Sequence, residues 1–329
     1  MKKILFALTA VSLMATMNSC KDDEPTDGGN SGPLTVEQKQ RALVSYVGHS
    51  GVYGPAGGDA ATNIPIFNDI VATSNTNDIV GMTFQPVIVA NNQAIIPYLQ
   101  PFFYKDNNDT PFVNLINNGL LVHMNPPTTN FGINFFYSAG TNMGSSASKD
   151  DVLGNANGYV SNTPEVGVAV RGSASGNTIN VTYKAKAFAP EAGAEYYISL
   201  LVVEKNGNTR QAVDQGTFNT IATRNILRAS GITATATSGL KTPVAGLPQN
   251  GYSGISPIFS SSAAANAEVE KTVAVNYKGL TSDWVTAFGE NYSNWKYNAS
   301  NTAVIAVVWK WYPSESKAYY SNCVYADVK

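Results

Sequence analysis

Cysteine and histidine are almost absent from this chain, which has two residues of each among 329. If Cys20 is modified, as argued below, Cys323 stands alone and no intramolecular disulfide can form. A histidine-based metal site or a Ser-His-Asp triad would have to use His49 or His123. The fold must therefore depend on its core, and we expect neither a metal nor a cofactor.

Neither histidine lies in a complete catalytic pattern. His49 is close to a serine, but the Gly-x-Ser-x-Gly pattern of a hydrolase nucleophile fails at Val52. His123 lies in an apolar run beside Met124, where we expect a structural histidine. No other residues supply a full catalytic constellation, so the sequence predicts a protein that is not an enzyme.

Charge and long apolar runs are scarce as well. Charged residues make up 13% of the chain and the formal net charge is −2, which argues against nucleic acid as a partner. Asn, Ser, Thr, Ala, Gly and Tyr are abundant instead, as in proteins with many short strands and polar turns. After residue 20, no run reaches the roughly 18 apolar residues of a membrane-spanning helix.

The chain begins with a leader of the bacterial lipoprotein type. Lys2 and Lys3 precede an apolar run over residues 4–14, and small or polar residues lead to Cys20. These are the parts of a signal peptide, although Met17 stands where leucine is usual. We expect residues 1–19 to be removed and Cys20 to carry acyl chains such as palmitate, which would be the membrane contact.

The residues after Cys20 predict an export signal and a flexible tether. A charged run resembles the export signal that sends some Gram-negative lipoproteins to the outer face of the outer membrane: Lys21, Asp22, Asp23 and Glu24. Residues 20–34 have almost no apolar side chain to bury, and such segments stay flexible. We expect an outer-membrane protein that faces the cell exterior, with a periplasmic orientation as the alternative.

Residues 35–145 mix helical and strand patterns and predict an α+β domain. A strand over 42–47, a Gly-rich loop over 48–58, a helix over 59–72 and a strand over 78–84 make a βαβ unit with a parallel strand pair. The same patterns predict further elements, namely helices over 34–40 and 93–99 and strands over 120–124 and 132–137.

Residues 161–329 predict an all-β antiparallel sandwich, after a linker over 146–160. Residues 177–189 alternate between apolar and polar, which indicates a half-exposed strand. Residues 196–203 are apolar on both faces and predict a central strand, followed by a hairpin turn at Asn206-Gly207. The last two strands are expected over 303–311 and 319–328.

Three segments resemble one protein family. The segment 44–55 (VSYVGHSGVYGP) is similar to the active-site corner of a thioredoxin-like domain, and the segments 196–204 (YYISLLVVE) and 225–229 (NILRA) are similar to a β-sandwich. Together they resemble the twenty-eight-kilodalton outer-membrane lipoprotein family. The resemblance implies an N-terminal thioredoxin-like domain followed by a C-terminal β-sandwich.

The chain departs from that family at its reactive positions. The family often carries Cys-x-x-Cys before a proline, and counting back from Pro55 places those positions at Gly51 and Gly54. Disulfide exchange needs an attacking thiolate and a second thiol, so the resemblance implies a degenerate, redox-inactive loop. The family histidine of the second half is replaced by Asn225.

Aromatic side chains supply the candidate ligand site. Residues 282–297 place rings among small polar residues, in the manner of surfaces that stack on sugars or anchor partners: Trp284, Tyr292, Trp295 and Tyr297. An aromatic loop packed over the sandwich is the alternative. Trp309 and Trp311 continue the apolar phase of Ile305 and Val307, so we expect both tryptophans to lie in the core. For Cys323 the pattern leaves two alternatives, a half-exposed thiol or a thiol packed under neighbouring tyrosines.

These features favour a non-enzymatic surface lipoprotein that binds a glycan, a peptide or a protein. Two alternatives stay open. One is a thiol-disulfide oxidoreductase relative that takes cysteines from a partner. The other is a structural subunit of a cell-envelope complex.

The lipid anchor gives the first prediction. We expect Cys20→Ala to release the protein in soluble form, because no other segment is expected to hold it at the membrane. Fractionation of cells that express the variant measures this. If Cys20→Ala stays in the membrane fraction, the chain is not anchored as a lipoprotein.

Overall fold

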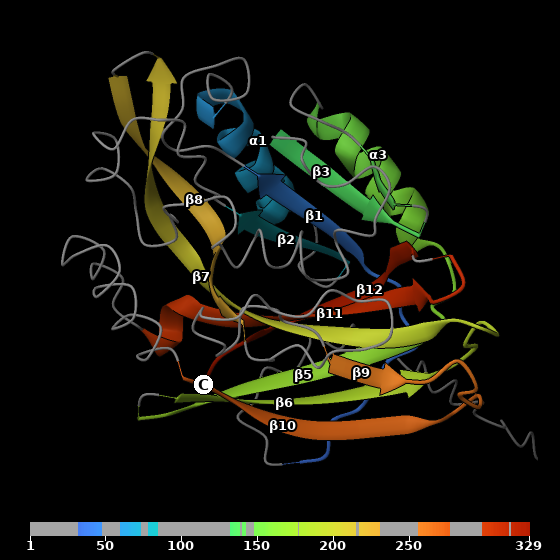
Figure 1. The fold of residues 1–329 in the computed structure, drawn as a ribbon. Helices are drawn as coiled ribbons and strands as arrows, with labels where there is room; N and C mark the ends of the chain where they lie inside the picture. Colours follow the sequence, from blue (N-terminus) through green and yellow to red (C-terminus); the bar gives the residue numbers. More distant parts are fainter. Residues whose placement is uncertain are drawn as a thin grey trace, which may run out of the picture. The chain divides into compact units, whose positions relative to one another are not determined.

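The computed structural model describes residues 32–47, 60–73, 78–84, 132–138, 140–142, 148–176, 178–214, 217–230, 256–276, 298–315 and 317–329. Residues 31–329 form one compact unit. The described residues are mostly strand with few helices (Figure 1), which confirms the prediction of a β-rich protein. Two sheets account for the strands.

The first part of the chain forms the predicted βαβ unit. Strands β1 and β2 are parallel, joined through helix α1, and β3 is antiparallel to β1 on its other side. A short strand, β4, pairs with β3, and helix α3 follows. The bounds of these elements are β1 Ala42–Val47, α1 Ala60–Thr73, β2 Ile79–Phe84, β3 Gly132–Tyr137, β4 Gly140–Asn142 and α3 Lys149–Val160.

The rest of the chain supplies the long antiparallel strands. The larger sheet has the order β12-β11-β7-β8-β2-β1-β3-β4, with β9 paired to β7, and the smaller sheet has the order β10-β6-β5. The bounds are β5 Val166–Ser175, β6 Thr178–Ala187, β7 Glu195–Asp214, β8 Thr217–Ser230, β9 Ser256–Phe259, β10 Glu268–Asn276, the 3₁₀ helix η5 Ala299–Asn301, β11 Thr302–Tyr312 and β12 Lys317–Asp327.

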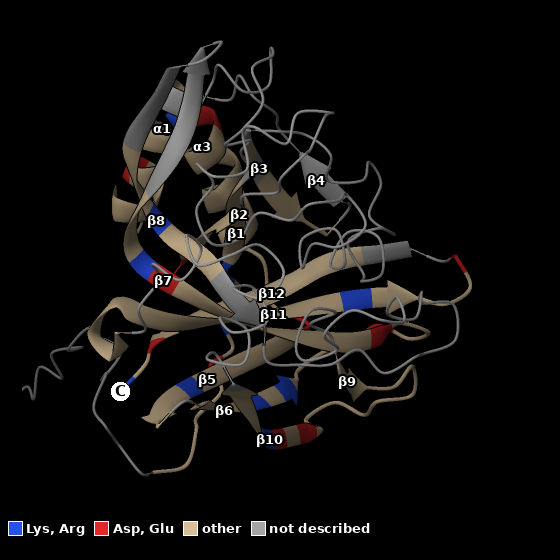
Figure 2. Cartoon of the chain, turned by 60° about the vertical axis from the view of Figure 1, so that its left-hand side comes forward, with Lys and Arg blue, Asp and Glu red and all other residues tan. Residues whose placement is uncertain are grey.

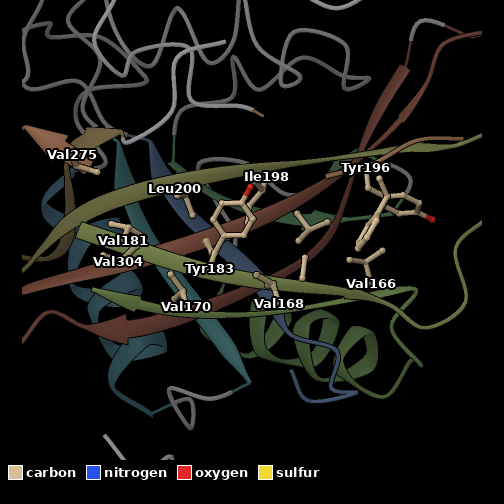
Figure 3. Packing of buried hydrophobic residues seen from close by; sticks show 14 of the residues in the cluster. Val166, Val168, Val170, Val181, Tyr183, Tyr196, Ile198, Leu200, Val275 and Val304 are labelled. Carbon is tan, nitrogen blue, oxygen red and sulfur yellow. The ribbon is translucent and has the colours of Figure 1, made fainter. Parts of the chain in front are cut away.

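Three hydrophobic clusters hold these layers together. One lies between α1, α3 and the strands β1 and β3. A central cluster joins β1, β2 and β3 to β7, β11 and β12, so the βαβ unit shares a core with the long strands. The third fills the space between the two sheets (Figure 3). It forms because β6 alternates strictly between buried and half-buried residues, as its sequence predicts.

Residues 146–160, predicted as a linker, include helix α3. Ser148 caps the helix by accepting a hydrogen bond from the Asp151 N–H, and Val152 and Ala156 are buried against the β1 and β3 side of the fold. Strands β1 to β4 before this segment and β7 and β8 after it belong to the larger sheet, where β2 meets β8. The helix is thus part of the packed structure.

The helix predicted over residues 34–40 is wrong. These residues form no helix and lie against β5, where a Cβ on Gly167 would come within 2.7 Å of the Glu37 carbonyl. The backbone of residues 39 and 41 is bonded instead by the side chain of Asn322, which is 0% exposed. A partner more than 280 residues away in sequence thus overrides the local helical pattern.

The hairpin turn predicted at Asn206-Gly207 is wrong as well, because β7 runs through both residues to Asp214. The side chain of Asn301 accepts a hydrogen bond from the Asn206 N–H at 3.0 Å and donates one to its carbonyl at 2.8 Å. A Cβ on Gly207 would lie 2.7 Å from the Ile226 side chain. The glycine therefore serves a close approach of strands and not a turn.

Tyr183 gives a prediction about stability. Its ring points from β6 across the core toward Ile198 and Leu200 (Figure 3), and its hydroxyl, at 0% residue exposure, has no hydrogen-bond partner among the described residues. A buried hydroxyl without a partner costs about 1–3 kcal/mol. We expect Tyr183→Phe to raise the free energy of unfolding by about 1 kcal/mol.

Chemical denaturation measures this, and Tyr196→Phe is the matched control. The Tyr196 hydroxyl donates to Glu165 and accepts from the Glu191 N–H, so its removal should lower the free energy of unfolding by about 1 kcal/mol or more. Equal effects of the two variants would contradict this account of Tyr183.

Candidate functional site

The site residues predicted from the sequence lie outside the described residues. They are the lipidation and export residues Cys20, Lys21, Asp22, Asp23 and Glu24, the loop residues Gly51, Gly54 and Pro55, the aromatic residues Trp284, Tyr292, Trp295 and Tyr297, and both histidines. Their roles stay predictions. The loop follows β1 directly and the aromatic segment lies between β10 and η5 in the chain.

Cys323 is fully buried in the central cluster, which resolves the two alternatives left by the sequence. Its Sγ lies 3.7 Å from the Ala42 carbonyl oxygen. Burial raises the pKa of the Cys323 thiol to about 12, more than its hydrogen bond with Tyr320 lowers it. Because the thiolate is the reactive form, this cysteine is inert in the folded protein.

Trp309 and Trp311 are buried in the same cluster, as their phase on β11 predicts. The Trp309 Nε1–H donates to the Ser199 hydroxyl at 2.9 Å, and the indole meets Tyr320 and Phe136 edge-on at 6.2 Å between ring centroids. Both tryptophans thus belong to the fold and not to an exposed surface.

A group of charges surrounds the buried Lys310 side chain. Along β11, Lys310 continues the phase of Val304, Ala306 and Val308, which face the core between the two sheets. Its side chain is 7% exposed, and its Nζ donates to Glu165 Oε1 at 2.8 Å and to Glu191 Oε2 at 2.9 Å. A lysine therefore closes one end of the sandwich core.

Two tyrosines complete this group, which we call the Lys310 cluster: Glu165, Glu191, Tyr196, Lys310 and Tyr312. The Tyr196 hydroxyl donates to Glu165 Oε2 at 2.7 Å, and the Tyr312 hydroxyl donates to Glu191 Oε2 at 2.6 Å. The Lys310 Nζ also lies 5.5 Å from the centroid of the Tyr312 ring. The cluster joins the chain before β5, the connection from β6 to β7, and β11.

The electrostatics of the Lys310 cluster favour the charged forms of Glu191 and Lys310 and the neutral form of Tyr312. Hydrogen bonds from Tyr312 and then Lys310 lower the pKa of Glu191. Burial alone lowers the pKa of Lys310, but its hydrogen bonds to Glu165 and Glu191 outweigh burial and raise it. Burial, together with the bond to Glu191, raises the pKa of Tyr312 to about 12.

Sequence reasoning missed this cluster, although one signal was present. A lysine in the phase of Val304, Ala306 and Val308 is a charge at a core position, and such charges are paired. The partners cannot be read from the pattern, because Glu165 and Glu191 lie in connections 145 and 119 residues away.

Other charged pairs lie nearer the surface, apart from Arg41, which is buried and pairs with Glu37. Lys184 and Lys186 of β6 pair with Glu268 of the neighbouring strand β10, where charged positions of both signs are coloured in Figure 2. Ion pairs that reach solvent contribute little stability. Across the described ranges, no His, Cys, Asp and Glu side chains gather into a group that would hold a metal ion. In the same ranges, no helix is long and apolar enough to cross a membrane.

Comparison with known proteins adds a fold relationship. No family model matches the chain, and no curated protein matches it. Among solved structures, the chain is similar to HBP35 of Porphyromonas gingivalis, with a TM-score of 0.51 and 10% sequence identity over 89% of this chain and 77% of that one. A likeness at this identity concerns the fold alone.

A second solved structure is a β-glucosidase from Listeria innocua in complex with glucose. Its TM-score is 0.19, at 13% identity over 52% of this chain and 17% of that one. A similarity this low does not indicate a shared fold.

The Lys310 cluster predicts how stability depends on pH. Lys310→Met leaves two carboxylates without their cation. We expect the free energy of unfolding to fall by about 2 kcal/mol at pH 7. This is less than the loss for a fully buried pair, because both carboxylates reach solvent. The pKa of Glu191 in the folded protein lies below its unfolded value near 4.3. The contribution of Glu191 to stability is therefore complete above about pH 4.3 and is lost as the pH falls through the folded pKa.

Urea denaturation between pH 7 and pH 3 measures both effects. The natural chain should lose stability steeply below about pH 4.3, and Lys310→Met should show a shallower slope. Lys184→Met, at an exposed pair, is the control and should change neither quantity appreciably. Parallel pH profiles for the natural chain and Lys310→Met would contradict this assignment.

Cys323 predicts an unreactive thiol. In a chain that carries Cys20→Ala, we expect Cys323 to resist maleimide labelling in the folded state and to label fully in denaturant. The same chain should not reduce insulin. Rapid labelling without denaturant would show that the thiol is accessible.

Proposed function

We propose that this chain is a lipid-anchored outer-membrane protein that faces the cell exterior and binds a glycan, a peptide or a protein without catalysis. The observation that carries the proposal concerns the two cysteines. Cys20 ends a lipoprotein leader and is consumed by the lipid, and Cys323 is 0% exposed. Neither one offers a thiol for exchange, which disfavours an oxidoreductase that borrows cysteines from a partner.

The N-terminal part is proposed as a degenerate thioredoxin-like domain of the twenty-eight-kilodalton lipoprotein family. Supporting it are the parallel β1–β2 pair joined through α1, the antiparallel β3 and β4, and the helix α3 after them. The similarity in fold to HBP35 covers both halves of the chain. Gly51 and Gly54 fall in the connection between β1 and α1, where the family carries its cysteines.

The ligand is proposed to bind at the aromatic segment between β10 and η5. Trp284, Tyr292, Trp295 and Tyr297 are flat rings among polar neighbours, which suits stacking on sugar rings or anchoring of a partner. The described tryptophans are used in the core, so Trp284 and Trp295 are the two remaining for a surface.

The decisive experiment tests whether the protein is exposed at the cell surface. An epitope tag is attached after Lys329 through a flexible linker, because the Lys329 N–H and carbonyl are bonded to β5. We expect protease added to intact cells to remove the tag without lysis. A matched variant with Lys21, Asp22, Asp23 and Glu24 replaced by alanine should be protected until the outer membrane is opened.

Protection of the natural chain on intact cells would overturn the surface location. If the natural chain is cleaved, binding to a glycan array with Trp295→Ala as the test variant and Trp309→Phe as the core control addresses the ligand. Loss of binding in Trp295→Ala alone supports the platform. Binding that survives Trp284→Ala and Trp295→Ala together would rule it out.

A further inference from the structure

The larger sheet is joined at one place by a single residue pair. Strands β1 and β2 are in register from Ala42 opposite Ile79 to the ends of both strands, and β7 and β11 pair over their shared length. In contrast, among the described residues β2 and β8 are paired in register only where Thr83 lies opposite Ile226. The continuity of the sheet between the βαβ unit and the long strands rests on this junction.

Side chains replace the missing ladder bonds at the β2–β8 junction. The Asn225 Nδ2–H donates to the Gly81 carbonyl at 2.8 Å, and the Thr83 hydroxyl donates to the Arg224 carbonyl at 2.8 Å. From helix α1, the Asn68 amide accepts from the Arg224 N–H at 3.0 Å and donates to the Ala222 carbonyl at 2.7 Å. Backbone groups of β2 and β8 are thus satisfied by three side chains.

Asn225 adopts an unusual backbone conformation at this junction. Its φ is +49°, in the left-handed region, although it lies inside β8 and is 6% exposed. Asparagine tolerates this region better than most residues, and such conformations persist where surrounding contacts hold them. The contact in question is the bond from the Asn225 amide to β2.

The other side of the junction has no free space. A Cβ on Gly81 would come within 2.1 Å of the Val71 side chain, so β2 lies directly against α1 there. The backbone of β2 is therefore fixed by the helix, and β8 is the strand that adapts to it.

We propose that the β2–β8 junction is the point at which the larger sheet opens first, and that Asn225 is the positioning residue that keeps it closed. Segments with few backbone hydrogen bonds open locally at lower free energy than the core. Opening at this junction breaks the pairing of β2 with β8 while β7 and β11 stay paired. The inference does not depend on the proposed ligand or location.

Hydrogen exchange followed by mass spectrometry tests the proposal on the full mature chain carrying Cys20→Ala. In the natural background, we expect peptides that cover 79–84 and 221–230 to exchange faster than peptides that cover 196–203 and 303–311. Asn225→Gly keeps the left-handed backbone but removes the amide donor. It should speed exchange of the first pair of peptides about tenfold and leave the second pair unchanged.

Asn266→Gly is the matched control, because Asn266 is exposed and has a φ of +65° in the connection before β10. It should leave the 79–84 and 221–230 peptides unchanged. Thr83→Val removes the other side-chain hydrogen bond that runs directly between β2 and β8, and it should act like Asn225→Gly. It provides a second test if Asn225→Gly does not fold.

Two results would overturn the proposal. One is equal exchange of all four peptides in the natural background, which would mean that the sheet opens as a whole. The other is an equal acceleration of all four peptides in Asn225→Gly and Thr83→Val, which would make both residues contributors to global stability alone.

Discussion

The side-chain amide of Asn322 is the interaction on which most of the fold converges. It is fully buried and uses its whole hydrogen-bonding capacity: it accepts from the Arg41 and Cys323 N–H groups and donates to the Lys39 and Val166 carbonyls, at 2.9–3.0 Å. One amide thereby joins the segment that leads into β1, the first residue of β5, and β12. These bonds supply partners for backbone groups where the three segments meet, and backbone groups buried without partners are costly.

An irregularity in β12 makes this possible. The register of β11 and β12 shifts so that Val308 lies opposite Asn322 and Trp309 opposite Tyr320, which leaves Ser321 out of the pairing. Its carbonyl accepts from the Gln40 amide and from the Tyr159 hydroxyl of α3. The bulge therefore directs β12 toward the entering chain and the helix, and Cys323 is buried as a consequence of that packing.

The sequence predicted the parts of the structure that local pattern controls. Alternation along β6 identified its buried face, the apolar run of β7 identified a central strand, and the βαβ unit followed from the order of patterns. The errors have a common cause, because residues 34–40 and Asn206-Gly207 are held by Asn322 and Asn301 from distant parts of the chain. Local propensity is a weak guide wherever a side chain from a distant part of the chain bonds the backbone.

The same difference between local pattern and long-range packing separates the candidate sites. The Lys310 cluster was missed because its carboxylates lie in connections whose place only the folded chain determines. The loop and the aromatic platform were predicted from composition and resemblance, and neither of these depends on long-range packing. Within the described residues, the buried lysine and the buried amides of Asn225 and Asn322 are bonded to other parts of the protein. Recognition of a ligand needs groups that are not already committed in this way. That requirement favours the connections between β1 and α1 and between β10 and η5 as the place of a ligand site, over the described framework.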